Sequence, residues 1–258
     1  MPELPDLQVF SKNLTKKLKG KRLEKVKIPY TKKLKVPAKK FSTELEGAKV
    51  KSVERVGKEL YFEFDNGHVL ALHLMLKGNL YLFDGEHDKK YPIIELYFND
   101  GTGLVMADFQ GAANPTLDPE EKDAPDALSD EINFKFLKEA LDRKATIKNV
   151  LLDQKIIRGI GNAYADEILW NAGISPFSVS NKIPDEKIKA LAKSIKSVLT
   201  DAQKNILKAD PEIITGEVRD FLPIHNAKKK TSPTGGEIKH EMVGGRKTYY
   251  TDEQELFK

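Results

Sequence analysis

The sequence predicts a two-domain α+β protein, with an antiparallel β-sandwich in its N-terminal half and a helical domain in its C-terminal half. Three observations carry this prediction. Short alternating segments with tight-turn pairs fill residues 21–110, segments of helical periodicity fill residues 134–207, and an acidic, Pro-bearing stretch separates them. At 258 residues the chain is long enough for two hydrophobic cores.

The N-terminal half opens with a predicted helix over residues 5–19, because Leu7, Phe10 and Leu14 share one face at helical spacing. Short strand-like runs follow at residues 22–29, 49–56, 58–65, 69–76, 79–84, 93–98 and 103–107. The turn pair Asn66-Gly67 joins two of these runs into a predicted hairpin over residues 58–76. Such a succession is typical of an antiparallel sandwich.

The C-terminal half begins after the acidic stretch, which we interpret as a linker or surface loop. Helices are predicted at residues 134–141, 147–154, 163–171 and 186–207, and two strands at residues 236–243 and 246–251 around the turn pair Gly244-Gly245. The expected divisions are residues 1–117 for the sandwich domain, 118–131 for the linker, 132–230 for the helical domain and 231–258 for a terminal hairpin.

Composition narrows the function classes. The chain has no cysteine, which excludes disulfides, Cys-ligated zinc and iron–sulfur clusters and fits a cytosolic protein. No apolar run reaches 18 residues and no signal pattern precedes the first helix, so we expect neither a membrane span nor secretion. Residues 1–60 carry 17 Lys and Arg against 7 Asp and Glu, and residues 61–142 carry 6 against 17. A polyanion could dock on the basic ends, although ordinary solvated lysines give the same pattern.

The first three residues, Met1-Pro2-Glu3, are a candidate catalytic group. Removal of Met1 would leave Pro2 with a free secondary amine, and an α-amine has a pKa near ~8, against roughly 10.4 for Lys. Such an amine can attack an electrophilic carbon and form an iminium, and Glu3 would supply a neighbouring acid or base. Taken alone, these residues fit an extended Pro-rich leader better.

The segment from Asp153 to Glu167 is the most informative stretch of the interior. Gly159 and Gly161 allow tight turns, and Asn162 is placed to cap the next helix. Free backbone amides at that helix start would form an anion site for a phosphate. A plain glycine-capped helical corner is the equally weighted alternative.

These motifs together resemble the formamidopyrimidine-DNA glycosylase and endonuclease VIII family of base-excision repair enzymes. Four segments match the family, in the family's order and over nearly the whole chain: Pro2-Glu-Leu-Pro5, Leu72-His-Leu-Met-Leu-Lys-Gly-Asn-Leu80, Gly159-Ile-Gly-Asn-Ala-Tyr-Ala-Asp-Glu167 and Gly245-Arg-Lys-Thr-Tyr-Tyr250. The third segment matches the helix–two-turn–helix motif, and the fourth matches the tip of the C-terminal finger.

The resemblance implies a role for each matching residue. Pro2 would attack the sugar C1′ of a damaged nucleotide or an abasic site, and Glu3 would move the proton that opens the sugar ring. Lys58, Asn162 and Arg246 would bind phosphates beside the lesion, with Lys58 counted among the catalytic residues and Arg246 also aiding β,δ-elimination. Leu76 would fill the gap left by the extruded base. The implied activity is that of a DNA glycosylase and abasic-site lyase.

One departure from the family concerns zinc. The family finger carries two Cys-x-x-Cys pairs, and the matching positions here are Ser232, Gly235, Thr251 and Gln254. None supplies a thiolate, so we expect no zinc, no other cofactor and the zincless finger found within the family. The five histidines do not cluster at ligand spacing, and His73, between two leucines, is interpreted as a structural hydrogen-bonding residue.

A second departure concerns the lesion. The family members that excise 8-oxoguanine have an Asp-Pro-Arg-Arg-Phe-Gly run, whereas this chain has Asp108-Phe-Gln-Gly-Ala-Ala113, without the Arg and Phe wedges. The loop after Asp220-Phe221 is also short. We therefore expect oxidised pyrimidines, hydantoins, bulky adducts, single-stranded damage or abasic sites, and not 8-oxoguanine, as preferred substrates.

Two alternatives come from other function classes. One is a DNA-damage binding protein that keeps the scaffold without efficient base excision, and the other is a basic nucleic-acid-binding structural protein. The matching set Pro2, Glu3, Lys58, Asn162 and Arg246 argues against both, because neither needs an N-terminal amine. We expect a monomer that binds damaged duplex or single-stranded DNA, without a membrane, in the cytoplasm or nucleoid or in a nucleus.

Overall fold

The structure, a computed structural model, describes all residues from 1 to 258 and divides into two compact units. Unit 1 contains residues 1–2, 6–121 and 210–217, and unit 2 contains residues 3–5, 122–209 and 218–258. The units differ from the predicted divisions in three places: residues 3–5 belong with the helices, residues 210–217 belong with the sandwich, and the terminal hairpin belongs with the helices. No helix combines the length and the apolarity that crossing a membrane requires.

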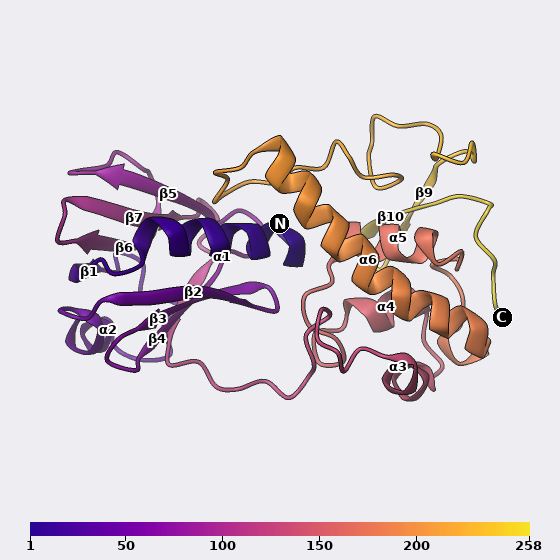
Figure 1. The fold of residues 1–258 in the computed structure, drawn as a ribbon, viewed down its shortest axis with the longest axis horizontal. Helices are drawn as coiled ribbons and strands as arrows, with labels where there is room; N and C mark the ends of the chain where they lie inside the picture. Colours follow the sequence, from indigo (N-terminus) through magenta and orange to yellow (C-terminus); the bar gives the residue numbers. More distant parts are fainter. The chain divides into compact units, whose positions relative to one another are not determined.

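Unit 1 contains two four-stranded antiparallel sheets, which confirms the predicted sandwich (Figure 1). One sheet has the order β1-β6-β7-β5, from β1 (Leu23–Lys27), β6 (Pro92–Phe98), β7 (Thr102–Ala107) and β5 (Asn79–Asp84). The other has the order β2-β3-β4-β8, from β2 (Val50–Val56), β3 (Glu59–Phe64), β4 (Val69–His73) and β8 (Asn114–Leu117). Helix α1 (Leu4–Leu18) contacts β2, where Thr15 Oγ1 accepts a hydrogen bond from Val53 N at 2.8 Å.

The hairpin predicted around Asn66-Gly67 is present, because β3 and β4 pair antiparallel from Glu63–Val69 onward. Gly67 has a φ of 90°, the left-handed conformation that glycine adopts without steric cost. Burial alternates along β3 as the sequence pattern requires, with Leu60, Phe62 and Phe64 buried in the core.

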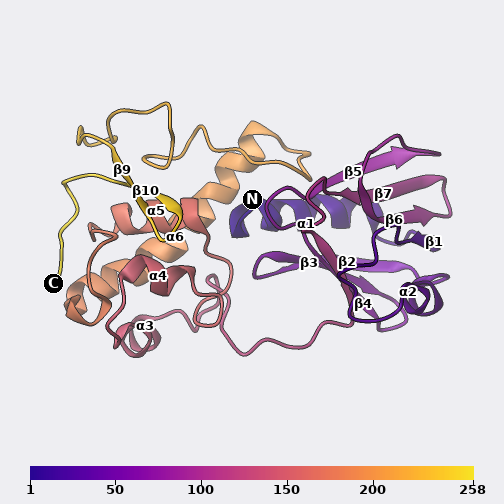
Figure 2. The ribbon, with the colours of Figure 1, turned by 180° about the vertical axis from the view of Figure 1, so that it is seen from behind.

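Two elements of unit 1 were not predicted. Helix α2 (Ala38–Leu45) is short and rich in lysine, and only Phe41 and Leu45, one helical turn apart, are buried. Helix α2, labelled in the view from behind (Figure 2), contacts β1. Strand β8 contains Pro115 and lies just before the predicted linker. It lies at the edge of its sheet, where a proline without an N–H is tolerated.

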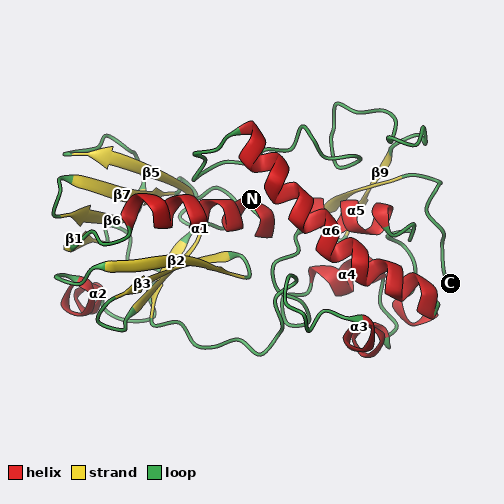
Figure 3. Ribbon diagram, in the orientation of Figure 1, coloured by secondary structure: helices red, strands yellow, loops and turns green.

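Unit 2 consists of helices packed around one core, with a single hairpin (Figure 3). The helices are α3 (Phe134–Leu141), α4 (Ile147–Leu152), α5 (Asn162–Asn171), the short 3-10 helix η1 (Ser180–Lys182) and α6 (Asp185–Ala209), and the hairpin strands are β9 (Lys239–Val243) and β10 (Arg246–Tyr250). The long α6 contacts α3 and α5 through an apolar face. The predicted helices and the Gly244-Gly245 turn are confirmed, and residues 210–238 form no helix or strand.

Candidate active site and nucleic-acid interface

Glu3 is held at the N-terminus of α5. Its carboxylate oxygens accept hydrogen bonds from the backbone N–H groups of Ala163, at 2.9 Å, and Tyr164, at 3.2 Å. These N–H groups have no partner within the helix, and the positive end of the helix dipole favours a negative charge there. The side chain is 5 % exposed, so its position is fixed. The sequence predicted this anion site for a phosphate, but the anion that occupies it is Glu3.

The two glycines of Gly159-Ile-Gly161 make room for the N-terminal residues. A Cβ on Gly161 would lie 2.3 Å from the carboxyl carbon of Glu3, and a Cβ on Gly159 would lie 2.4 Å from Leu4 Cδ1. Gly159 also has a φ of 106°, and its carbonyl oxygen accepts a hydrogen bond from Leu4 N at 3.3 Å. The motif is therefore a docking site for residues 3–4, a role that the sequence alone did not reveal.

The sequence predicted that Asn162 caps α5, but it does not. The N-cap is Gly161, and Asn162 is the first helical residue. Its side chain instead donates a hydrogen bond from Nδ2 to the carbonyl oxygen of Lys247 on β10, at 2.8 Å. Its Oδ1 is buried without a hydrogen-bond partner. This contact brings the start of α5 next to the strand that begins with Arg246, whose side chain is exposed.

A buried ion cluster that the sequence analysis missed joins the same hairpin to α4 and α5. Lys148 Nζ lies 2.6 Å from Asp166 Oδ1 and donates a hydrogen bond to Thr248 Oγ1 at 2.8 Å. Asp166 Oδ2 contacts His225 Nδ1 at 2.8 Å and accepts the backbone N–H of Tyr249 at 2.9 Å. Burial lowers the pKa of Lys148, while Asp166 opposes this shift. A lysine in the apolar segment Thr146–Leu152 was the available sequence signal.

The loop over residues 218–226 is held against α5 by hydrogen bonds. Glu167 Oε1 accepts backbone hydrogen bonds from Ile224, at 3.0 Å, and His225, at 2.6 Å. Arg219 donates to the Tyr164 hydroxyl at 3.2 Å. Burial raises the pKa of Glu167 to about 7, against the lowering effect of the two backbone hydrogen bonds.

Lys58 and Leu76 belong to unit 1. Lys58 was predicted to begin a strand, but it lies in the turn between β2 and β3, one residue before β3 begins, and it follows Gly57, which has a φ of 60°. Leu76 lies in the loop between β4 and β5 and is 59 % exposed, unusual for a leucine next to a sheet. His73, at the end of β4, accepts a hydrogen bond from Met75 N at 3.0 Å, in line with the structural role predicted for it.

A second exposed apolar side chain, Phe109, lies on a loop next to that of Leu76. The loops over residues 74–78 and 108–113 start and end on paired strands, since His73 pairs with Asn114 and Asn79 pairs with Ala107. Phe109 is 63 % exposed. Its loop is rigid because the buried Asp108 carboxylate accepts three backbone N–H groups, from residues 110, 112 and 113, at 2.8 to 2.9 Å. The sequence comparison found no wedge in this loop, because Phe109 does not occupy the matching position.

The N-terminal amine is the remaining part of the predicted site. Pro2 is buried next to Glu3 in the chain, and Met1 is present before it. The Met1 amino group forms an ion pair with the carboxylate of Glu217. The structure therefore gathers Glu3, Asn162 and the Arg246 hairpin in unit 2, whereas Pro2, Lys58 and Leu76 belong to unit 1.

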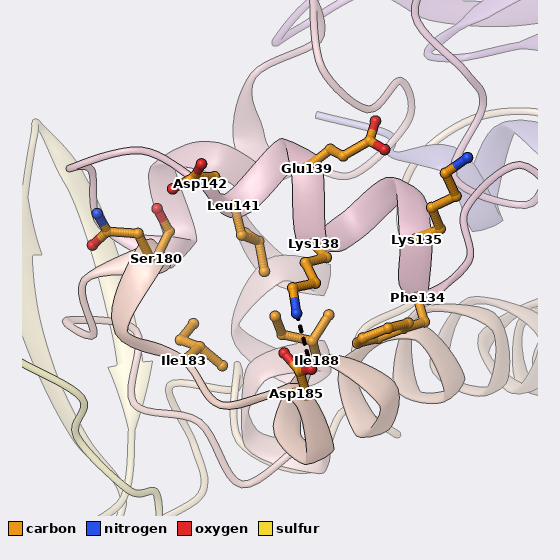
Figure 4. A pocket seen from close by; sticks show the side chains of 11 residues that line it. Phe134, Lys135, Lys138, Glu139, Leu141, Asp142, Ser180, Ile183, Asp185 and Ile188 are labelled. Carbon is orange, nitrogen blue, oxygen red and sulfur yellow. Dashed lines mark hydrogen bonds and ion pairs between the residues drawn. The ribbon is translucent and has the colours of Figure 1, made fainter.

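A cavity of about 560 Å³ lies elsewhere in unit 2, between α3 and the start of α6 (Figure 4). Phe134, Leu141, Ile183 and Ile188 form its apolar wall, and Lys138 forms an ion pair with Asp185 at 2.9 Å. No predicted site residue lines this cavity, so its size alone does not make it the active site.

Comparison with known proteins agrees with this geometry. The family model of the formamidopyrimidine-DNA glycosylase N-terminal domain matches residues 1–114. The family model of the formamidopyrimidine-DNA glycosylase H2TH domain matches residues 124–209. The chain belongs to the formamidopyrimidine-DNA glycosylase family. Membership places it among the base-excision repair glycosylases, and H2TH denotes the helix–two-turn–helix of the Gly159–Glu167 segment.

Relatives of the glycosylase family match along almost the whole chain. The formamidopyrimidine-DNA glycosylase of Lactobacillus johnsonii is 31% identical, over 97% of this chain and 97% of its own. That of Bacillus subtilis is 30% identical with the same coverage. The Lactococcus lactis Fpg, solved with DNA containing an oxidized pyrimidine, is 26% identical, with a TM-score of 0.87 over 98% of this chain and 99% of its own.

Proposed function

We propose that the protein excises damaged bases and cleaves the abasic product through the secondary amine of Pro2. The observation that carries this proposal is the fixed carboxylate of Glu3. Two backbone N–H groups and the space left by Gly161 hold it beside the residue whose nitrogen would react. A carboxylate with one defined position next to a nucleophile is what proton transfer during covalent catalysis requires.

The reaction begins when the Pro2 nitrogen forms a bond to the sugar C1′ as the damaged base leaves with the electrons of the glycosidic bond. Glu3 takes up the proton that the Pro2 nitrogen loses on bonding to C1′ and passes it to the ring oxygen, so that the ring opens and the C1′–N bond becomes a cationic iminium. The iminium acidifies the 2′ hydrogen, whose loss expels the 3′ phosphate, and a second elimination expels the 5′ phosphate. Water then hydrolyses the iminium and restores the amine.

Lys58, Asn162 and Arg246 would bind the phosphates on either side of the damaged nucleotide. The cations Lys58 and Arg246 would stabilise the leaving phosphates and hold a distorted backbone. The Asn162–Lys247 hydrogen bond supports this assignment, because it couples the start of α5 to the hairpin that carries Arg246.

The substrate we propose is an oxidised pyrimidine, a hydantoin, a bulky adduct or an abasic site, in duplex or single-stranded DNA, in preference to 8-oxoguanine. The loop over residues 218–226 supports this, since Glu167 and Arg219 hold it against α5. A loop so anchored has little freedom to close over a flipped purine. Two similar proteins were solved with damaged DNA, one with DNA that contains an oxidized pyrimidine and one with DNA that contains a carbocyclic 8-oxoguanine.

Retention of Met1 favours a second candidate, a damage-binding protein without catalysis. With Met1 in place, the Pro2 nitrogen is an amide without a nucleophilic lone pair. An intact-mass measurement of the purified protein separates the two, because loss of one methionine mass is required for the lyase.

Borohydride trapping on abasic-site DNA tests the proposed function. The wild-type protein is expected to give a covalent protein–DNA adduct, and Pro2→Gly to lose the adduct while it keeps salt-sensitive DNA binding. Lys89→Gln, a change at an exposed lysine outside the proposed site, serves as the control and should trap as the wild type does. Binding without any trapping by a Met1-free wild type contradicts the proposal.

A further inference from the structure

The base of the β9–β10 hairpin is built from two facing tight turns. The first spans residues 232–235 and the second spans residues 251–254, and each closes with a backbone hydrogen bond, Gly235 N to Ser232 O at 3.0 Å and Gln254 N to Thr251 O at 3.3 Å. The first and last residues of the two turns, Ser232, Gly235, Thr251 and Gln254, match the four positions at which the family's finger carries its cysteines. The turns flank the hairpin on both sides, so whatever joins them fixes the hairpin.

A single carboxylate oxygen joins the two turns. Glu253 Oε2 accepts hydrogen bonds from Ser232 Oγ at 2.8 Å, from Thr251 Oγ1 at 3.0 Å and, from α5, from Trp170 Nε1 at 3.5 Å. Ser232 is the first residue of one turn and Thr251 is the first residue of the other. Both hydroxyl residues are buried, at 6 % and 1 % exposure, so the two donors have few alternative partners.

Neighbouring groups complete this network. The Thr234 hydroxyl lies 3.0 Å from Ser232 Oγ, which also accepts the backbone N–H of Gly236. Gly236 itself leaves the space that Glu253 fills, since a Cβ there would lie 2.3 Å from Oε2. The hydroxyls of Thr234 and Ser232 lower the pKa of Glu253 to about 2, so the carboxylate is ionised at neutral pH.

We propose that Glu253 is the positioning residue of the finger, and that its carboxylate joins the two turns in place of a metal ion and thereby fixes the hairpin that presents Arg246. Hydrogen bonds to an ionised acceptor are short and strong, and several donors on one oxygen impose a defined geometry. The second turn follows β10 directly, so the orientation of β10, and of Arg246 at its start, depends on it. This inference rests on the proposed function only where Arg246 is concerned.

The single tryptophan of the chain reports on the network independently of any activity. Because Trp170 Nε1 donates to Glu253, Glu253→Ala is expected to shift the emission of the indole. Glu253→Gln, which keeps the shape without the charge, is expected to give a smaller shift. Glu255→Gln is the matched control, since Glu255 lies two residues further on and pairs with Lys187 at 3.2 Å, whereas the indole N–H donates to Glu253.

Kinetics on abasic-site DNA test the link to Arg246. Glu253→Ala is expected to raise KM about tenfold, the usual effect of losing charge-assisted hydrogen bonds that hold a binding group, and to change kcat less. In an Arg246→Gln background the same change should have little further effect, because the residue being positioned is already absent.

The outcomes separate this inference from the proposed function. Unchanged Trp170 emission in both Glu253 variants, or an equal shift in Glu255→Gln, overturns the role of Glu253 even if the wild type forms the covalent adduct. A KM effect that is equally large without Arg246 overturns the positioning of that residue. A wild type that binds DNA without forming the adduct contradicts the lyase, and the emission shift then still decides the role of Glu253. If Glu253→Ala does not fold, Glu253→Gln carries both measurements.

Discussion

At the scale of single residues, glycine sets the position of the proposed proton donor. Gly161 adopts an extended backbone conformation that any residue could adopt, so its requirement for glycine is purely one of space. The space is taken by the Glu3 carboxylate, which in turn satisfies two N–H groups that the helix leaves unpaired. Glu3, which is distant in sequence, therefore explains why position 161 requires a glycine.

Gly161→Ala is expected to lower the free energy of unfolding by about 1–3 kcal/mol, because the new methyl group overlaps the Glu3 carboxyl. It should also reduce base excision, since the carboxylate is displaced. In a Glu3→Ala background the same substitution should cost little stability, because the obstructing atoms are gone. Urea unfolding of the four proteins measures the coupling, and equal costs in both backgrounds would show that Glu3 is not the obstacle.

At the scale of elements, α5 organises unit 2 through polar groups in its first two turns. Its N-terminus binds Glu3, Asp166 binds the hairpin, and Glu167 binds the loop over residues 218–226. An amphipathic helix needs no buried carboxylates for its own stability, and burying them is costly unless they are paired. Their presence indicates that α5 holds irregular segments in place.

Glu167 makes the stability of unit 2 depend on pH. Its pKa is raised to about 7 by burial, whereas an unfolded chain gives a glutamate near ~4.3, so the folded state binds the proton more tightly. The stabilisation is complete below about pH 4 and is lost as pH rises through about 7. Glu167→Gln should therefore gain up to ~3 kcal/mol relative to the wild type between pH 4.5 and pH 8.

Urea unfolding at several pH values measures this difference. The exposed Glu139→Gln on α3 is the control and should follow the wild type throughout. A wild-type stability that rises, instead of falling, relative to Glu167→Gln over this range would contradict the assignment.

The loops over residues 74–78 and 108–113, which expose Leu76 and Phe109, are the second feature at the scale of elements. On the proposed function, an apolar side chain on a rigid loop can enter the gap left by an extruded base. Phe109→Ala should lower excision from duplex DNA by about tenfold and leave excision from single-stranded DNA nearly unchanged, since only a duplex has a gap to fill. Single-turnover rates on the two substrates measure this.

Tyr91→Ala is a suitable control for Phe109, because Tyr91 is equally exposed, at 62 %, and belongs to the same unit. If this variant loses duplex activity to the same degree, exposed aromatic area in general, and not the loop over residues 108–113, accounts for the effect.

At the scale of the whole molecule, the chain supplies charge and hydrogen bonds where a zinc-bearing relative would use metal. It has no cysteine, and three of the four finger positions, Ser232, Thr251 and Gln254, make side-chain hydrogen bonds at the base of the hairpin. We therefore expect base excision to be unaffected by a strong chelator or a thiol oxidant. Activity assays before and after each treatment measure this, with a Cys₄-zinc glycosylase as the sensitive control, and a loss restored by added zinc would refute it.

Much of the fold was predictable because its signals are local. The alternation in β3, the Asn66-Gly67 and Gly244-Gly245 turns and the apolar face of α6 each act within a few residues. Helix α2 and strand β8 were missed because their signals are weak by themselves. Only two residues of α2 are buried, so its apolar pattern is short. The proline of β8 is tolerated because the strand lies at the edge of its sheet.

The sequence by itself determined the fold class, the family and the residue types of the site, since motif order and periodicity are properties of the chain. Tertiary structure decided what those residues touch: Glu3, and not a phosphate, at the start of α5, Asn162 on the hairpin, and Lys148, Asp166 and Glu253 as the groups that hold that hairpin. Each of these contacts joins residues distant in sequence, from about twenty to more than a hundred positions apart. Local propensity carries no information about such pairs, because they form only when burial leaves a polar group with a single available partner.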